Sequence, residues 1–196
     1  MTELLTQVAA QAEMEGQPAE PASAQRARKS HGMVAVPENL QQAKACKEAG
    51  NALYNEEKIK PAIRKYHEAL LHLKACQARC TMLEFGPETT AGMDKPTQEE
   101  VDKVQAACLS NLAACLLKLP TCDYSRVVTY CNNALAIQPN NSKAVFRKGV
   151  AHYRMGNYSI ARQYLKDAAK LCKGRDDLIT KYLKLCAEAD ACSAKK

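Results

Sequence analysis

The sequence predicts an all-α fold of three stacked helix pairs followed by a C-terminal capping helix. Apolar and small residues recur at helical spacing along most of the 196 residues, and no segment has the pattern of a β-strand. Aromatic residues make up only 5% of the chain, so a core must consist mainly of Leu, Ala, Ile, Val, Cys and Tyr. The expected helices occur in pairs separated by short turns, and this repetition predicts a stack.

The first helix pair is expected over about residues 43–85. Small and apolar residues from Ala43 to Tyr54 share one helix face, and Pro61 occupies a position that the start of a second helix tolerates. The second helix continues at the same period until a Gly-Pro pair ends it. An insertion over residues 86–96 follows, which its Pro, Gly and Thr content predicts to be a loop.

The second helix pair is expected over about residues 97–139. Thr97 and Glu100 fit a capping box, which predicts that a helix begins there. This helix ends near Pro120, and a short turn around Asp123 leads into a partner helix that stops before Pro139.

The third pair is expected over about residues 142–173, with Asn141 among the residues that cap its first helix and Gly156 in its turn. One further amphipathic helix over about residues 176–191 is expected to cap the stack. The chain therefore divides into this helical domain over residues 39–196 and an N-terminal tail. The tail, residues 1–38, is rich in Ala, Gln, Glu, Pro and Ser and is expected to be disordered.

The three pairs share a spacing of small and large residues, which indicates an internal repeat. The matched sets are Gly50, Ala62, Tyr66 and Ala69 in the first pair, Ala113, Val127, Cys131 and Ala134 in the second, and Gly149, Ala161, Leu165 and Ala168 in the third. This pattern resembles the tetratricopeptide repeat (TPR) over about residues 40–173. The resemblance implies a right-handed superhelical stack whose concave groove is lined by the first helix of each pair.

Two stretches of the second pair carry a finer resemblance. They are Cys-Leu-Ser-Asn-Leu-Ala-Ala-Cys-Leu-Leu over residues 108–117 and Tyr-Ser-Arg-Val-Val-Thr-Tyr-Cys over residues 124–131. By these motifs, the tail and the insertion, the sequence is identified as a member of the tetratricopeptide repeat protein 9 family. Co-chaperone immunophilins have similar insertions and are the more distant resemblance.

The first helices present polar residues to the groove. Lys47 and Asn51 are four residues apart, as are Lys143 and Arg147, so each pair shares a helix face. Amide, ammonium and guanidinium donors with no acidic residue among these positions would hold both carboxylates of a C-terminal Asp. The full groove set adds Asn111 and Lys118 from the second pair.

The resemblance to TPR proteins that bind Hsp90 and Hsp70 tails assigns these residues to a carboxylate clamp. The implied clamp consists of Lys47, Asn51, Asn111, Lys143 and Arg147, with Tyr54 and Lys118 as accessory groove residues. The implied ligand is a C-terminal Glu-Glu-Val-Asp peptide. We therefore expect a non-enzymatic, co-chaperone-like adaptor that is a cytoplasmic monomer and needs no cofactor or metal.

Alternatives remain open at this point. The groove could take a different acidic ligand, or the chain could be a general scaffold that binds another protein through its groove, convex face or tail. His72, Cys76 and Cys80 share a helix face, but a zinc site would need a fourth ligand, and core packing is the simpler interpretation. No catalytic motif, nucleic-acid-binding module, signal peptide or membrane-spanning run is recognised. The ten Cys, scattered through helical patterns, are expected to be mostly small buried side chains.

Overall fold

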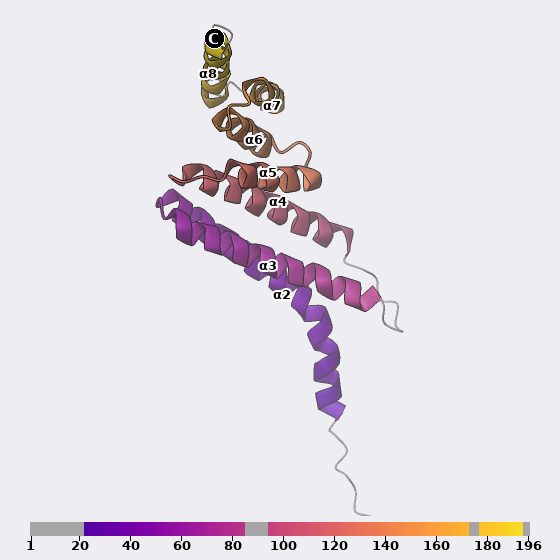
Figure 1. Ribbon diagram of the computed structural model, residues 1–196. Coiled ribbons are helices and arrows are strands. Elements are labelled where there is room, and N and C mark those ends of the chain that lie inside the picture. Colours follow the sequence, from indigo (N-terminus) through magenta and orange to yellow (C-terminus); the bar gives the residue numbers. More distant parts are fainter. Residues whose placement is uncertain (1–21, 85–93, 173–176, 194–196) are drawn as a thin grey trace, which may run out of the picture. The chain divides into compact units, whose positions relative to one another are not determined.

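The computed structural model describes residues 22–84, 94–172 and 177–193, and the chain divides into two compact units, Met1–Val36 and Pro37–Lys196. The described residues contain helices and no strand (Figure 1). The helices are α2 (Ala22–Asn55), α3 (Ile59–Glu84), α4 (Lys95–Lys118), α5 (Tyr124–Ile137), α6 (Ser142–Arg154), α7 (Tyr158–Leu171) and α8 (Asp177–Ser193). The predicted all-α arrangement of three helix pairs and a capping helix is confirmed.

The N-terminal segment differs from the expected disordered tail. Residues 22–38 are helical and belong to α2, whereas residues 1–21 lie outside the described part of the chain. The physical reason is local propensity: the stretch over residues 22–29 is made mostly of Ala, Gln, Arg and Lys, which are strong helix formers. A search for apolar periodicity does not detect such a helix.

Within the unit Pro37–Lys196, the helices from α3 onward stack in chain order (Figure 1). Each is in contact with the next, from α3 and α4 through to α7 and α8. The first helices of the second and third pairs also touch each other, because α4 contacts α6, and α6 in turn contacts the capping helix α8. Helices α4, α6 and α8 therefore share one side of the stack.

The repeated small residues are points of close helix contact. A Cβ added to Gly50 would lie 2.8 Å from Tyr66 Cε1, and one added to Gly149 would lie 3.0 Å from Leu165 Cγ. Tyr66 and Leu165 are completely buried, at 1% and 0% exposed. The repeated spacing of small and large residues in the sequence therefore corresponds to the points where a small residue of the first helix makes room for a large side chain of the second.

The caps and turns at the helix ends agree with those expected from the sequence at Asn141 and Gly156, and differ at the start of α4. Asn141 caps α6 by accepting a hydrogen bond from the Ala144 amide, and Gly156 provides the turn before α7 with φ of 82°. The predicted capping box at Thr97 is wrong, because Asp94 is the N-cap of α4 and accepts from the Thr97 amide at 3.4 Å. Of the predicted loop over 86–96, residues 85–93 lie outside the described range, and Lys95 already belongs to α4.

The cysteines support the core rather than a reactive site. Cys108, Cys115 and Cys131 are fully buried free thiols. Burial raises the pKa of Cys108 and of Cys131 to about 12 and that of Cys115 to about 11, so all three stay protonated near neutral pH. Cys76 is buried in the same way, while the side chain of Cys80 lies outside the described residues. Along the described helices, none combines the length and apolar character needed to cross a membrane.

Candidate functional site

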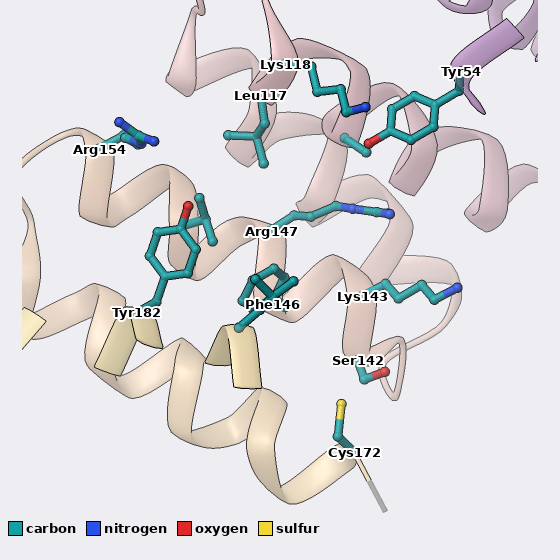
Figure 2. A pocket seen from close by; sticks show the side chains of 13 residues that line it. Tyr54, Leu117, Lys118, Ser142, Lys143, Phe146, Arg147, Arg154, Cys172 and Tyr182 are labelled. Atoms are coloured by element: carbon teal, nitrogen blue, oxygen red, sulfur yellow. The ribbon is translucent and has the colours of Figure 1, made fainter. Parts of the chain in front are cut away.

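A cavity of about 520 Å³ opens on the side of the stack that α4, α6 and α8 share (Figure 2). Four of the residues predicted from the sequence line it, namely Tyr54 of α2, Lys118 of α4, and Lys143 and Arg147 of α6. The remaining three, Lys47, Asn51 and Asn111, do not line this cavity. The structure therefore gathers the predicted residues into two groups with different environments.

The two predicted asparagines form a network with a buried tyrosine. Asn51 Oδ1 accepts a hydrogen bond from Tyr66 Oη at 2.8 Å and another from Asn111 Nδ2 at 3.0 Å. Both acceptor positions of this carbonyl are thus occupied. The network joins α2, α3 and α4, and it holds the two amides in register across the first two helix pairs.

Lys47, the first of the cations expected in the groove, forms an ion pair with its neighbour Glu48. Glu48 Oε1 lies 2.8 Å from Lys47 Nζ, and Glu48 Oε2 accepts from Asn51 Nδ2 at 3.0 Å. These two hydrogen bonds, first that from Lys47, lower the pKa of the Glu48 carboxyl. The Glu48 side chain is 65% exposed, so this ion pair is weak and open to exchange with a ligand carboxylate.

Arg147 is the most firmly placed cation. Its Nη1 donates to the Ser110 backbone oxygen at 2.8 Å and also contacts the Ser110 hydroxyl. These contacts with α4 fix the position of the guanidinium. Burial lowers the pKa of Arg147 below its ordinary value, yet arginine stays charged in proteins. The guanidinium extends toward the end of the cavity where Tyr54 and Lys143 lie (Figure 2).

Lys118 and Tyr54, the two accessory groove residues expected from the sequence, lie in contact with each other. Lys118 Nζ lies 4.5 Å from the centre of the Tyr54 ring, within the range of a cation–π interaction, and 3.9 Å from Glu57 Oε1. Lys143 has no ion pair with any residue that the structure describes, and its side chain is exposed. This end of the cavity therefore carries three cations and little compensating acid.

Sequence reasoning missed the other half of the cavity. Phe146 and Val150 of α6, Leu117 of α4 and Tyr182 of α8 form an apolar wall, and Arg154 adds a fourth cation. Arg154 could have been found, because it lies seven residues after Arg147, two turns along the same face. Tyr182 could not, since only the packing of α8 against α6 brings it to the cavity.

The arrangement suits one kind of ligand best. Ammonium and guanidinium groups are aimed at one end of an open cavity, and apolar side chains continue from it. Such a surface attracts a carboxylate by charge-assisted hydrogen bonds and accommodates apolar side chains next to it. Extended peptide with an acidic end has this chemistry.

Comparisons with known proteins agree on the fold. No protein-family model matches the chain. Tetratricopeptide repeat protein 9C of Xenopus tropicalis is 37% identical over 153 residues, which cover 77% of this chain and 85% of that protein. Among solved structures, the C-terminal TPR-containing domain of a Plasmodium falciparum FK506-binding protein matches with a TM-score of 0.66 at 28% identity, over 82% of this chain and 96% of that one. The first TPR of Spaghetti (RPAP3), solved with the HSP90 peptide SRMEEVD, matches with a TM-score of 0.56 at 19% identity, over 77% and 94% of the chains, which is a likeness of fold alone.

Proposed function

Because the chain belongs to the tetratricopeptide repeat protein 9 family, we propose that it is a non-enzymatic adaptor that binds acidic C-terminal peptides of the chaperones Hsp90 and Hsp70. One observation carries the proposal: Lys143 and Arg147 stand together at one end of an open cavity, and neither pairs with an acidic side chain of the described residues. Two adjacent cations without a carboxylate partner favour an anionic ligand from outside.

The bound peptide would place its terminal carboxylate and its last side-chain carboxylate among these cations. Arg147 keeps N–H donors for a ligand, because its hydrogen bonds to the described residues are those that Nη1 donates to Ser110. Lys143 would supply a mobile ammonium, and Lys47 would join by exchanging its exposed partner Glu48 for the ligand. The amide group of Asn111 donates one N–H to Asn51 and would offer its second to the peptide.

The expected affinity is moderate. Each charge-assisted hydrogen bond contributes about 1.5–3 kcal/mol net, and several of them act against the cost of ordering a flexible peptide. A balance near −8 kcal/mol corresponds to a dissociation constant of about 1 μM. The fold likeness to a TPR solved with an HSP90 peptide supports chaperone tails as the ligand class to try first.

The test is calorimetric titration of the full chain with the peptide Met-Glu-Glu-Val-Asp. Lys143→Ala should weaken binding at least tenfold, because about 1.5 kcal/mol or more of charge-assisted bonding is lost. Lys166→Ala, an exposed cation on α7, is the matched control and should bind like the native chain. Equal affinities for both variants would reject the groove as the binding site and favour a scaffold that uses another surface.

A further inference from the structure

We propose that Arg154 and Tyr182 form a second anion-binding position, which selects peptides with an anionic side chain about three to five residues before the C-terminus. The inference rests on the proposed function and extends it, because it names which peptides the groove prefers. Its basis is the far end of the cavity, which none of the residues predicted from the sequence occupies.

Arg154 is a cation in the cavity without a counter-charge. It lines the same cavity as Lys143 and Arg147, and no acidic side chain among the described residues pairs with it. It lies in the last turn of α6, where a positive charge also stabilises the helix dipole. Arg154 could stabilise the helix dipole with its side chain in any direction. The dipole therefore does not explain why this side chain lines the cavity.

Tyr182 lines the same cavity as this cation and is held in place by its neighbours. Its ring lies 5.8 Å from that of Phe146 and 5.6 Å from that of Tyr153, both in edge-on geometry. Figure 2 shows Arg154 and the Tyr182 hydroxyl toward one end of the cavity, Lys143 and Arg147 toward the other, and Phe146 between them. A guanidinium and a fixed hydroxyl donor together suit an oxyanion.

The helix geometry sets the position along the peptide. Arg154 follows Arg147 by seven residues and Lys143 by eleven, which corresponds to about 10 Å and about 16 Å along α6. An extended peptide advances about 3.3 Å per residue. With the terminal carboxylate at Lys143 and Arg147, a side chain about three to five residues earlier reaches Arg154, and the residues between pass the apolar wall.

The chemistry required is an oxyanion on a side chain, supplied by Asp or Glu or by a phosphorylated hydroxyl. Both would accept hydrogen bonds from the guanidinium, and a phosphate adds a larger charge. A cation at the same place would be repelled. The peptide SRMEEVD has Glu three residues and Arg five residues before its last residue, so it contains one favourable and one unfavourable group within the window.

The experiment is a double-mutant cycle by calorimetry on the full chain. The ligands are SRMEEVD, the same peptide with Glu or phosphoserine in place of its Arg, and the same peptide with Gln in place of its first Glu. The native chain is compared with Arg154→Gln, with Tyr182→Phe, which keeps the ring packing, and with Lys166→Gln as an exposed control with the same charge change.

At least one of two changes to the peptide should alter its affinity for the native chain and for the Lys166→Gln control. Replacing the peptide's Arg by Glu should tighten binding about fivefold or more, or replacing its first Glu by Gln should weaken binding by a similar factor. In Arg154→Gln these ratios should shrink to within about twofold, with a smaller reduction in Tyr182→Phe. A larger gain from phosphoserine than from Glu would identify a phosphorylated side chain as the preferred source.

The failures are distinguishable. Binding that depends on the terminal carboxylate, with the same peptide ratios in the native chain and in Arg154→Gln, overturns the second position and leaves the proposed function intact. Absence of carboxylate-dependent binding with every peptide overturns the proposed function and this inference together. A fall in thermal stability of Arg154→Gln with unchanged ratios assigns the residue to the helix end alone.

Discussion

Asn111 donates a hydrogen bond from Nδ2 to Oδ1 of Asn51 at 3.0 Å, across sixty positions of the sequence. The same oxygen accepts from the hydroxyl of Tyr66, which is completely buried. The residues that the groove would use are thus tied to the contacts that hold the first two helix pairs together. Binding and stability are therefore expected to be coupled at Asn51 and separable at exposed cations such as Lys143.

Replacing Asn51 by Ala should destabilise the fold by about 2–3 kcal/mol, because the buried Tyr66 hydroxyl and the Asn111 amide both lose their acceptor. Tyr66→Phe removes one donor only and should cost about 1 kcal/mol. Asn55→Ala, at the exposed end of α2, is the control and should change little. Urea unfolding measures all three; equal stabilities for the Asn51 and Asn55 variants would show that the network contributes no net energy.

The two neighbouring cations of α6 should behave differently when removed. Both Lys143→Ala and Arg147→Ala should weaken the binding of an acidic peptide at least tenfold. Only Arg147→Ala should also lower stability, by about 1–2 kcal/mol, because Ser110 is 3% exposed and loses a hydrogen-bond partner. Paired calorimetry and thermal unfolding would detect the split, and a stability loss in Lys143→Ala of the same size would contradict it.

Glu48→Gln should strengthen binding of an acidic peptide. The substitution removes the carboxylate that pairs with Lys47 and leaves the cation for the ligand. Because the pair is solvent-exposed, the gain should be small, about twofold to fivefold, and should shrink as salt is added. Glu57→Gln is a useful comparison, since Glu57 neighbours Lys118 at the longer distance of 3.9 Å. Weaker binding by the Glu48 variant would mean that this residue positions Lys47 rather than competing for it.

Gly50→Ala should destabilise the first helix pair despite the better helix propensity of Ala. The propensity gain is about 1 kcal/mol, while forcing a methyl group to 2.8 Å from Tyr66 Cε1 costs about 1–3 kcal/mol in a packed core. Because Tyr66 would have to shift, the hydrogen bond to Asn51 should be strained and peptide affinity should fall as well. A variant more stable than the native chain would show that Tyr66 can move aside freely.

Stability should decrease above about pH 9 through the buried thiols. The pKa of Cys115 rises from 9.0 to about 11 by burial, so the folded chain holds this proton more tightly than the unfolded chain does. The contribution is fully present below pH 9 and is lost as pH rises toward 11, at about 1 kcal/mol per pH unit for each such group. Urea unfolding at pH 8, 9 and 10 would show the decline. In Cys115→Ala the free energy of unfolding should decline less steeply with pH. A decline identical to that of the native chain would contradict the assignment of the pH dependence to this thiol.

Much of the fold could be predicted from the sequence because its signals are local. Helical periodicity, the Pro and Gly positions and the Asn141 cap depend on neighbouring residues. The start of α4 differs from the expected one because Asp94 and Thr97 are both good capping residues, and it is the Asp94 carboxylate that accepts from the Thr97 amide. The helical segment before residue 39 was missed because its first part, residues 22–29, consists of strong helix formers without an amphipathic pattern.

The candidate site was predictable only in part. Register along single helices placed Lys143 beside Arg147, and the repeat placed Asn51 near Asn111. The ion pair of Lys47 with Glu48 was missed, because the rotamers that bring adjacent side chains together cannot be derived from spacing. Tyr182 was missed because its position depends on how α8 docks against α6.

The most direct measurement compares Met-Glu-Glu-Val-Asp as the free acid with the same peptide amidated at its C-terminus. Amidation removes the terminal negative charge and leaves every side chain in place. If Lys143 and Arg147 hold the terminal carboxylate, calorimetry should give a dissociation constant of about 1 μM for the free acid and at least tenfold weaker binding for the amide. Equal affinities, or no binding of either peptide, would contradict the proposal that this groove binds acidic C-terminal tails.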